Sequence, residues 1–322
     1  MTAARVQEAI PCAHAYRGDA IENSANGNRD RKGSTFSVAA VYAVSGAGFA
    51  VGLLLLARTM PEAAYGQLAL LIALLNLSHR VAPLGLDGLV NRHPVDLGPA
   101  LLGRLYAAAV PVTVLVLVAS RAVYGLGTRE LTWLGIGILA GAASYLGASL
   151  LQARHRFLSS ALVNHATDFT VLLAGIISLA FVFRDAAPPL GIVVGGHLIA
   201  APLVLARIRG SSGSTAESVP LSWRESLSYA GFVAGAMALQ QLDRLVIPRL
   251  LSFEALASFS VLAVLVIAPF HVLQLAVEHT LLPRLRHAAG PVERRRLLRT
   301  EALALFGIGL PAGLLAVGIV PW

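Results

Sequence analysis

Arg80 lies near the middle of an apolar segment, residues 68–90, where a charge needs a physical reason. Four residues follow one another at intervals of four, three and four, which places them on one face of a helix: Asn76, Arg80, Pro83 and Asp87. A guanidinium is permanently charged and can donate two hydrogen bonds to one phosphate, so the segment is typical of an anion site. A structural pair of Arg80 with Asp87 or Asp168 is the alternative. The predicted substrate-binding residues here are Asn76, His79, Arg80 and Asp87.

Two carboxylates in other apolar segments are candidates for ion or proton coupling. Asp168 follows His165 in residues 161–183, and Asp243 lies in residues 226–248. A carboxylate in a partly dry cavity binds protons more tightly than one in water. A local pair of Asp243 with Arg244 or Arg249 is an equally good interpretation.

A third polar group lies in residues 256–282. His271, Gln274 and Glu278 are spaced by three and four, and so form one stripe on a helix. Such a stripe faces protein or water rather than lipid. It holds helices together more often than it binds a ligand, but we include His271 and Gln274 among the substrate contacts and Glu278 among the coupling residues. The spacing does not indicate a metal site, and we expect no cofactor.

The elements that carry these residues are predicted to be membrane helices. The chain is 56% hydrophobic and only 13% charged, with a mean hydropathy of +0.71. A bilayer core of about 30 Å needs roughly 20 apolar helical residues, and backbone groups in lipid must pair within the segment. We predict an all-α, polytopic bundle of about nine transmembrane helices. The spans are 35–57, 68–90, 100–120, 131–151, 161–183, 188–206, 226–248, 256–282 and 302–320.

The basic residues indicate the orientation. With the N-terminus inside, the inner loops contain 18 of the 25 basic residues and the outer loops five. The positive-inside rule then places the N-terminus in the cytoplasm. This pattern explains the pI of about 10.3 without nucleic acid. Four clustered arginines at 294–299 set orientation or hold anionic lipid headgroups.

The chain is predicted to have four parts. Residues 1–34 form a polar, disordered cytoplasmic tail without a signal peptide, and 35–206 form a six-helix N-terminal lobe. A Gly/Ser-rich cytoplasmic linker, 207–225, leads to a partial C-terminal lobe of three helices, 226–322. A shift of 192 residues aligns 62–92 with 254–284 at six identical positions, including Glu62 with Glu254. This weak repeat indicates two parallel lobes, an arrangement typical of transporters.

Two stretches resemble a known family. The sequence LLARTMPEAAYGQLAL (55–70) and the sequence PLGLDGLVNR (83–92) are similar to the first two helices of the polysaccharide flippases. These belong to the multidrug/oligosaccharidyl-lipid/polysaccharide exporter superfamily. QQLDRLVI (240–247) and LLPRL (281–285) resemble their helices seven and eight. The resemblance implies export of a lipid-linked sugar across the inner membrane of a bacterial cell by alternating access, with membrane lipids and glycan-assembly proteins as partners. Arg80 would then attract the pyrophosphate of the lipid carrier.

Three other interpretations remain. A membrane glycan polymerase or ligase needs a large external loop, whereas the predicted outer loops have about ten residues or fewer. We therefore expect that the protein is not an enzyme. A cation-coupled multidrug exporter shares the fold, but abundant arginine favours an anionic cargo. An inactive fragment of a flippase is the third.

Overall fold

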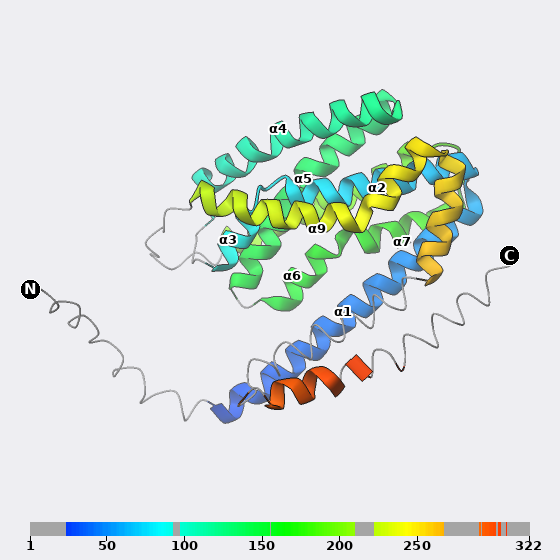
Figure 1. Ribbon diagram of the computed structural model, residues 1–322. Coiled ribbons are helices and arrows are strands. Elements are labelled where there is room, and N and C mark those ends of the chain that lie inside the picture. Colours follow the sequence, from blue (N-terminus) through cyan, green and yellow to red (C-terminus); the bar gives the residue numbers. More distant parts are fainter. Residues whose placement is uncertain are drawn as a thin grey trace, which may run out of the picture.

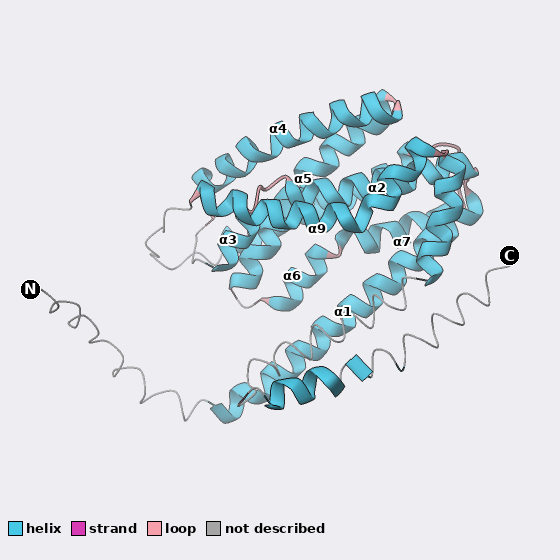
Figure 2. Ribbon diagram, in the orientation of Figure 1, coloured by secondary structure: helices cyan, strands magenta, loops and turns pink. Residues whose placement is uncertain are grey.

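The computed structural model describes residues 24–92, 97–154, 156–209 and 222–266, a short helix at 292–300, and residues 290, 302, 303 and 307. This part of the chain consists of helices and short loops, and no strand is found in it (Figure 2). The labelled helices are α1 (Ser24–Thr59), α2 (Glu62–Val81), α3 (Leu86–Arg92), α4 (Pro99–Tyr124), α5 (Thr128–Ala153), α6 (Phe157–Asn164), α7 (Ala166–Ser178), α8 (Ala187–Arg209) and α9 (Trp223–Leu250). A further helix runs over Phe253–Val266.

The all-α prediction is confirmed, and the apolar segments include helices long enough to cross a membrane. Four helices meet the requirements of length and hydropathy: Ala40–Thr59 of α1, α4, α5, and Ala187–Ile208 of α8. The bent pair α6 and α7 makes a fifth if it counts as one span. A membrane bundle is therefore consistent with the structure. The count of nine spans is not established by the described residues.

The bundle is arranged around α2 and α5, which run through its middle, with α4 and α1 towards opposite edges in Figure 1. Most residues in the apolar part of α5 are buried inside the protein, whereas only a minority are buried in the apolar parts of α1 and α4. α5 packs chiefly against α8, α1 against α7, and α9 against α2. The middle of α2, from Leu68 to Leu75, is buried on every side. The two central helices thus carry the core.

Large apolar side chains cover the outside of the bundle. On α4, for example, Leu115 is 70% exposed and Val118 62%, and on α8 Ile199 is 64% exposed. Soluble monomers rarely expose continuous apolar surface of this kind, because it is unfavourable in water. An outer surface of this composition suits lipid.

The predicted helix at 68–90 is interrupted, which corrects one expectation. α2 ends at Val81, a turn occupies 82–85, and α3 starts at Leu86. Pro83 has no backbone N–H to continue the helix, and Leu84 and Gly85 have φ of +47° and +80°. A side chain at Gly85 would be strained and would meet the backbone carbonyl of Ser226 in α9. Asp87 therefore does not share one continuous helical face with Arg80.

The predicted helix at 161–183 is also two helices. α6 and α7 meet at His165 with a bend of 49°. Here the sequence contains neither Pro nor Gly to indicate the break. A third difference concerns the predicted tail: the helix α1 begins at Ser24, so the backbone of 24–34 is helical. The adjoining span supplies a helix end from which further turns can propagate.

Candidate functional site

A cluster of polar and aromatic side chains lies inside the bundle, where α2, α5 and α8 meet. His79 on α2 is fully buried, and so is His197 on α8. The ring of His79 lies 4.5 Å from the ring of Tyr145 on α5 and 5.3 Å from that of His197, measured between centroids. Gly141 makes room for His79, since a Cβ at Gly141 would lie 2.7 Å from the Cβ of His79. Three helices thus bring three rings together.

The buried histidines are only partly satisfied. Nε2 of His197 and the hydroxyl of Thr167 on α7 form a hydrogen bond of 2.8 Å. Within the described part of the chain, both ring nitrogens of His79 lack a hydrogen-bond partner, and so does Nδ1 of His197. Buried polar atoms are nearly always paired in native proteins. These three nitrogens are therefore buried polar atoms whose hydrogen-bonding capacity the described residues leave unused.

Arg80 lies beside this cluster. Its Cζ is 4.8 Å from the centre of the Tyr145 ring, a cation–π contact. The side chain is exposed, in contrast to the neighbouring His79. Arg80, Asp87 and Asp168 all belong to the described part of the chain. No ion pair of Arg80 with either carboxylate is found there. Asp87 is close enough to act on Arg80 electrostatically. The guanidinium is thus positioned by the Tyr145 side chain.

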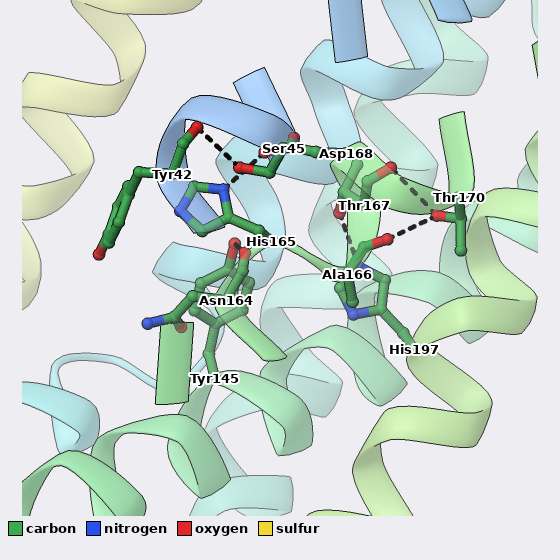
Figure 3. A network of polar contacts seen from close by, with 10 residues as sticks. All are labelled: Tyr42, Ser45, Tyr145, Asn164, His165, Ala166, Thr167, Asp168, Thr170 and His197. Atoms are coloured by element: carbon green, nitrogen blue, oxygen red, sulfur yellow. Dashed lines mark hydrogen bonds and ion pairs between the residues drawn. The ribbon is translucent and has the colours of Figure 1, made fainter. Parts of the chain in front are cut away.

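The break between α6 and α7 borders the cluster, as Figure 3 shows. The Tyr145 hydroxyl donates a hydrogen bond of 3.2 Å to the carbonyl of Asn164, the last residue of α6. In an unbroken helix that carbonyl would accept from the N–H of Asp168, which here bonds to the carbonyl of His165 at 3.0 Å. Tyr145 therefore satisfies the backbone group that the bend leaves free.

His165 and Asp168 stabilise the bend from its other side. Nδ1 of His165 and Oδ2 of Asp168 are 2.6 Å apart, and Asp168 lies in the first turn of α7. A carboxylate in that position is favoured by the helix dipole. The Tyr42 ring of α1 meets the His165 ring edge-on at 4.5 Å between centroids. Discontinuous helices of this kind form binding sites in many transporters.

The other predicted site residues are distributed as follows. Asn76 is half-buried on α2, and Asp87 is half-buried on α3. Asp243 on α9 accepts a hydrogen bond of 2.8 Å from the backbone N–H of Arg244, and no contact between it and the cluster is found in the described chain. Three residues lie outside the described part: His271, Gln274 and Glu278.

Three residues of the cluster were not predicted, namely Tyr145, Thr167 and His197. His197 follows the rule applied to His79, because it is a lone polar side chain in an apolar segment, VVGGHLIAA (193–201). Tyr145 and Thr167 carry no such signal, since Tyr and Thr are common in membrane helices. Their role depends on the bend at His165.

The arrangement offers donors and a fixed cation rather than ligands for a metal. Among the described residues, no three His, Cys, Asp or Glu side chains group closely enough to hold a metal ion. Arg80 can pair with phosphate, and the imidazoles of His79 and His197 can hydrogen-bond phosphate or sugar hydroxyls.

The chain was compared with models of protein families, with curated proteins and with solved structures, and none of them matched it.

Proposed function

We propose that the protein is an inner-membrane transporter that moves a lipid-linked oligosaccharide or polysaccharide precursor across the bilayer by alternating access. The observation that carries this proposal is the cluster of His79, Tyr145 and His197 inside an otherwise apolar bundle, next to a bent helix pair and with Arg80 beside it. Polar and ionisable groups are unfavourable within a bilayer and mark substrate pathways.

The chemistry of the cluster favours an anionic cargo rich in hydroxyls. Arg80 supplies one permanent positive charge near the face of the Tyr145 ring. The imidazoles of His79 and His197 can be neutral, and they offer hydrogen bonds without adding a negative charge. A pyrophosphate joined to a sugar contains both kinds of acceptor. A cationic drug would meet the charge of Arg80 unfavourably.

The described connections leave little room for an external catalytic domain. Two residues join α1 to α2, three join α4 to α5, and two join α9 to the helix Phe253–Val266. On the proposed topology these turns lie on the extracytoplasmic side of the membrane. This supports a transporter over a glycan polymerase or ligase.

The two-lobe arrangement, with nine spans and a cytoplasmic N-terminus, is part of the proposal. The starts of the two repeats touch each other. The hydroxyl of Ser258 donates a hydrogen bond of 3.0 Å to Glu62, and a Cβ at Gly66 would collide with the carbonyl of Phe253. An axis along the membrane normal that relates two parallel lobes would bring such equivalent segments together.

The test is a flipping assay in proteoliposomes with a fluorescent polyprenyl-pyrophosphate sugar. Arg80→Gln should reduce transport by about ten- to a hundredfold, because a charge-assisted hydrogen bond is worth roughly 1.5–3 kcal/mol. Arg80→Lys should recover only part of the rate, since an ammonium lacks the forked geometry. Arg129→Gln is the matched control, because Arg129 makes only a 3.6 Å contact with Asp185 at the surface.

Normal transport by Arg80→Gln at equal protein level would refute the role of this arginine. Transport of a cationic drug, with no movement of the lipid-linked sugar, would replace the proposed substrate class.

A further inference from the structure

The most basic helix that the structure describes has no polar partner for its arginines. Residues 292–300 form one helix, in which every side chain except Leu297 is exposed. Among the described residues, the four guanidiniums of this helix make neither a hydrogen bond nor an ion pair. They belong to Arg294, Arg295, Arg296 and Arg299.

Some other arginines of the described chain have partners. Arg121 and Arg154 donate to the carbonyls of Leu126 and Ile208, and Arg80 lies against a tyrosine ring. The group at 294–299 is therefore distinguished by its density. Unpaired charges of one sign at this spacing repel one another, and an external anion relieves the repulsion.

Exposed apolar side chains accompany the arginines. Val292 is 81% exposed, and it shares one helical face with Arg295, Arg296 and Arg299 at intervals of three, four and seven. Leu298 is 48% exposed and neighbours Arg294 and Arg295 along the helix surface. A soluble anion would satisfy the charges but not these apolar groups. The boundary between lipid headgroups and acyl chains satisfies both.

We propose that helix 292–300 is a lipid-binding element that docks on the anionic headgroups of the cytoplasmic leaflet. The guanidiniums pair with headgroup phosphates, while Val292 and Leu298 insert at the acyl boundary. The inference requires that the chain lies in a membrane with this loop inside, but it does not require transport.

The experiment places one fluorescent reporter on the full-length protein in nanodiscs. Cys12 is the only cysteine, so Cys12→Ser gives a background in which Val292→Cys is labelled with an environment-sensitive dye. In discs of phosphatidylglycerol the emission should shift to the blue, as expected for a dye at the acyl boundary. In phosphatidylcholine it should resemble that of a dye in water. Inorganic phosphate or pyrophosphate added to the neutral discs should leave it unchanged.

Charge removal then tests the mechanism. Each arginine near an anionic surface increases binding by about fivefold, so Arg295→Gln/Arg296→Gln/Arg299→Gln should reduce the docked-to-free ratio by about a hundredfold. High salt should have a similar effect, because it screens surface charge. The matched control is Arg58→Gln/Arg184→Gln/Arg249→Gln, which removes three charges from the side of the membrane opposite to the cytoplasm on the proposed topology and should leave the emission unchanged.

Equal emission in the two lipids, or a triple variant that keeps the full blue shift, would overturn the proposal. A shift caused by pyrophosphate in neutral discs would show that the helix binds a soluble anion instead. None of these outcomes depends on flipping activity, so a failure here is separate from a failure of the transport proposal.

Discussion

The contact between α1 and α7 allows a stringent test of the packing, because two glycines meet there at backbone distance. A Cβ at Gly52 would lie 2.6 Å from the carbonyl oxygen of Val171 and 2.7 Å from the backbone of Leu172. A Cβ at Gly175 would lie 2.7 Å from the carbonyl oxygen of Gly52. Small residues let membrane helices approach in this way, so that packing and weak polar contacts replace the missing hydrophobic force.

Gly52→Ala should destabilise the protein by pushing these helices apart. Ordinary contact begins at 3.4 Å, so α1 and α7 must separate by about 0.8 Å. Overpacking of this kind costs about 1–3 kcal/mol. Gly46→Ala is the control on the same helix, since nothing lies within 4 Å of a Cβ there. Both changes gain the same helix propensity of about 1 kcal/mol, and their difference therefore reports the packing alone.

Thermal unfolding in detergent, followed by circular dichroism at one scan rate, measures this difference. Gly52→Ala should melt roughly 2–12 °C below Gly46→Ala, given about 2–4 °C for each kcal/mol in a chain of this size. Adding Gly175→Ala to Gly52→Ala should lower the melting temperature by less than the sum of the single effects, since the helices are already apart. Equal melting temperatures for Gly52→Ala and Gly46→Ala would refute the close approach.

Two further predictions concern the buried hydrogen bond and the topology. Thr167→Val should lower the free energy of unfolding by about 1–3 kcal/mol, because it leaves Nε2 of the buried His197 without its partner. The control is Thr132→Val, which removes an exposed hydroxyl of α5 and should be nearly neutral in the same melting assay. In a Cys12→Ser background, a membrane-impermeant maleimide should label Thr128→Cys in intact cells and Gly98→Cys only after permeabilisation, and the reverse pattern would contradict the proposed orientation.

The long apolar helices could be predicted from the sequence because lipid imposes a simple rule on length. α4, α5 and α8 begin and end within a few residues of the predicted spans 100–120, 131–151 and 188–206. Hydropathy over some 20 residues determines them, and neighbouring helices change only their ends. α2 is different, because its polar ends bring it below the hydropathy of a span while its centre is buried in protein.

The breaks in helices were harder to predict, for two separate reasons. Pro83 and Gly85 were visible in the sequence, but a membrane helix often tolerates a proline as a kink, and only the positive φ at Leu84 and Gly85 shows a full interruption here. The bend at His165 has no local signal. It is stabilised by the Tyr145 hydroxyl, which lies twenty residues earlier on another helix. Tertiary contacts of this kind do not appear in periodicity or composition.

The same bend limits what Asp168 can do. The sequence favoured Asp168 as a coupling carboxylate, and in the structure this group is 2.6 Å from His165 at the point where α6 turns into α7. A proton or cation that bound Oδ2 of Asp168 would compete with His165 for that oxygen. Loss of that contact would leave the Tyr145 hydroxyl as a remaining side-chain hydrogen bond to the backbone of the bend, and the Tyr145 ring also lies against Arg80. Ion or proton coupling at Asp168 therefore requires that the bend and the surroundings of Arg80 change together. Asp243 accepts a hydrogen bond from the backbone of its neighbour Arg244, and no such connection between Asp243 and the cluster is found in the described chain.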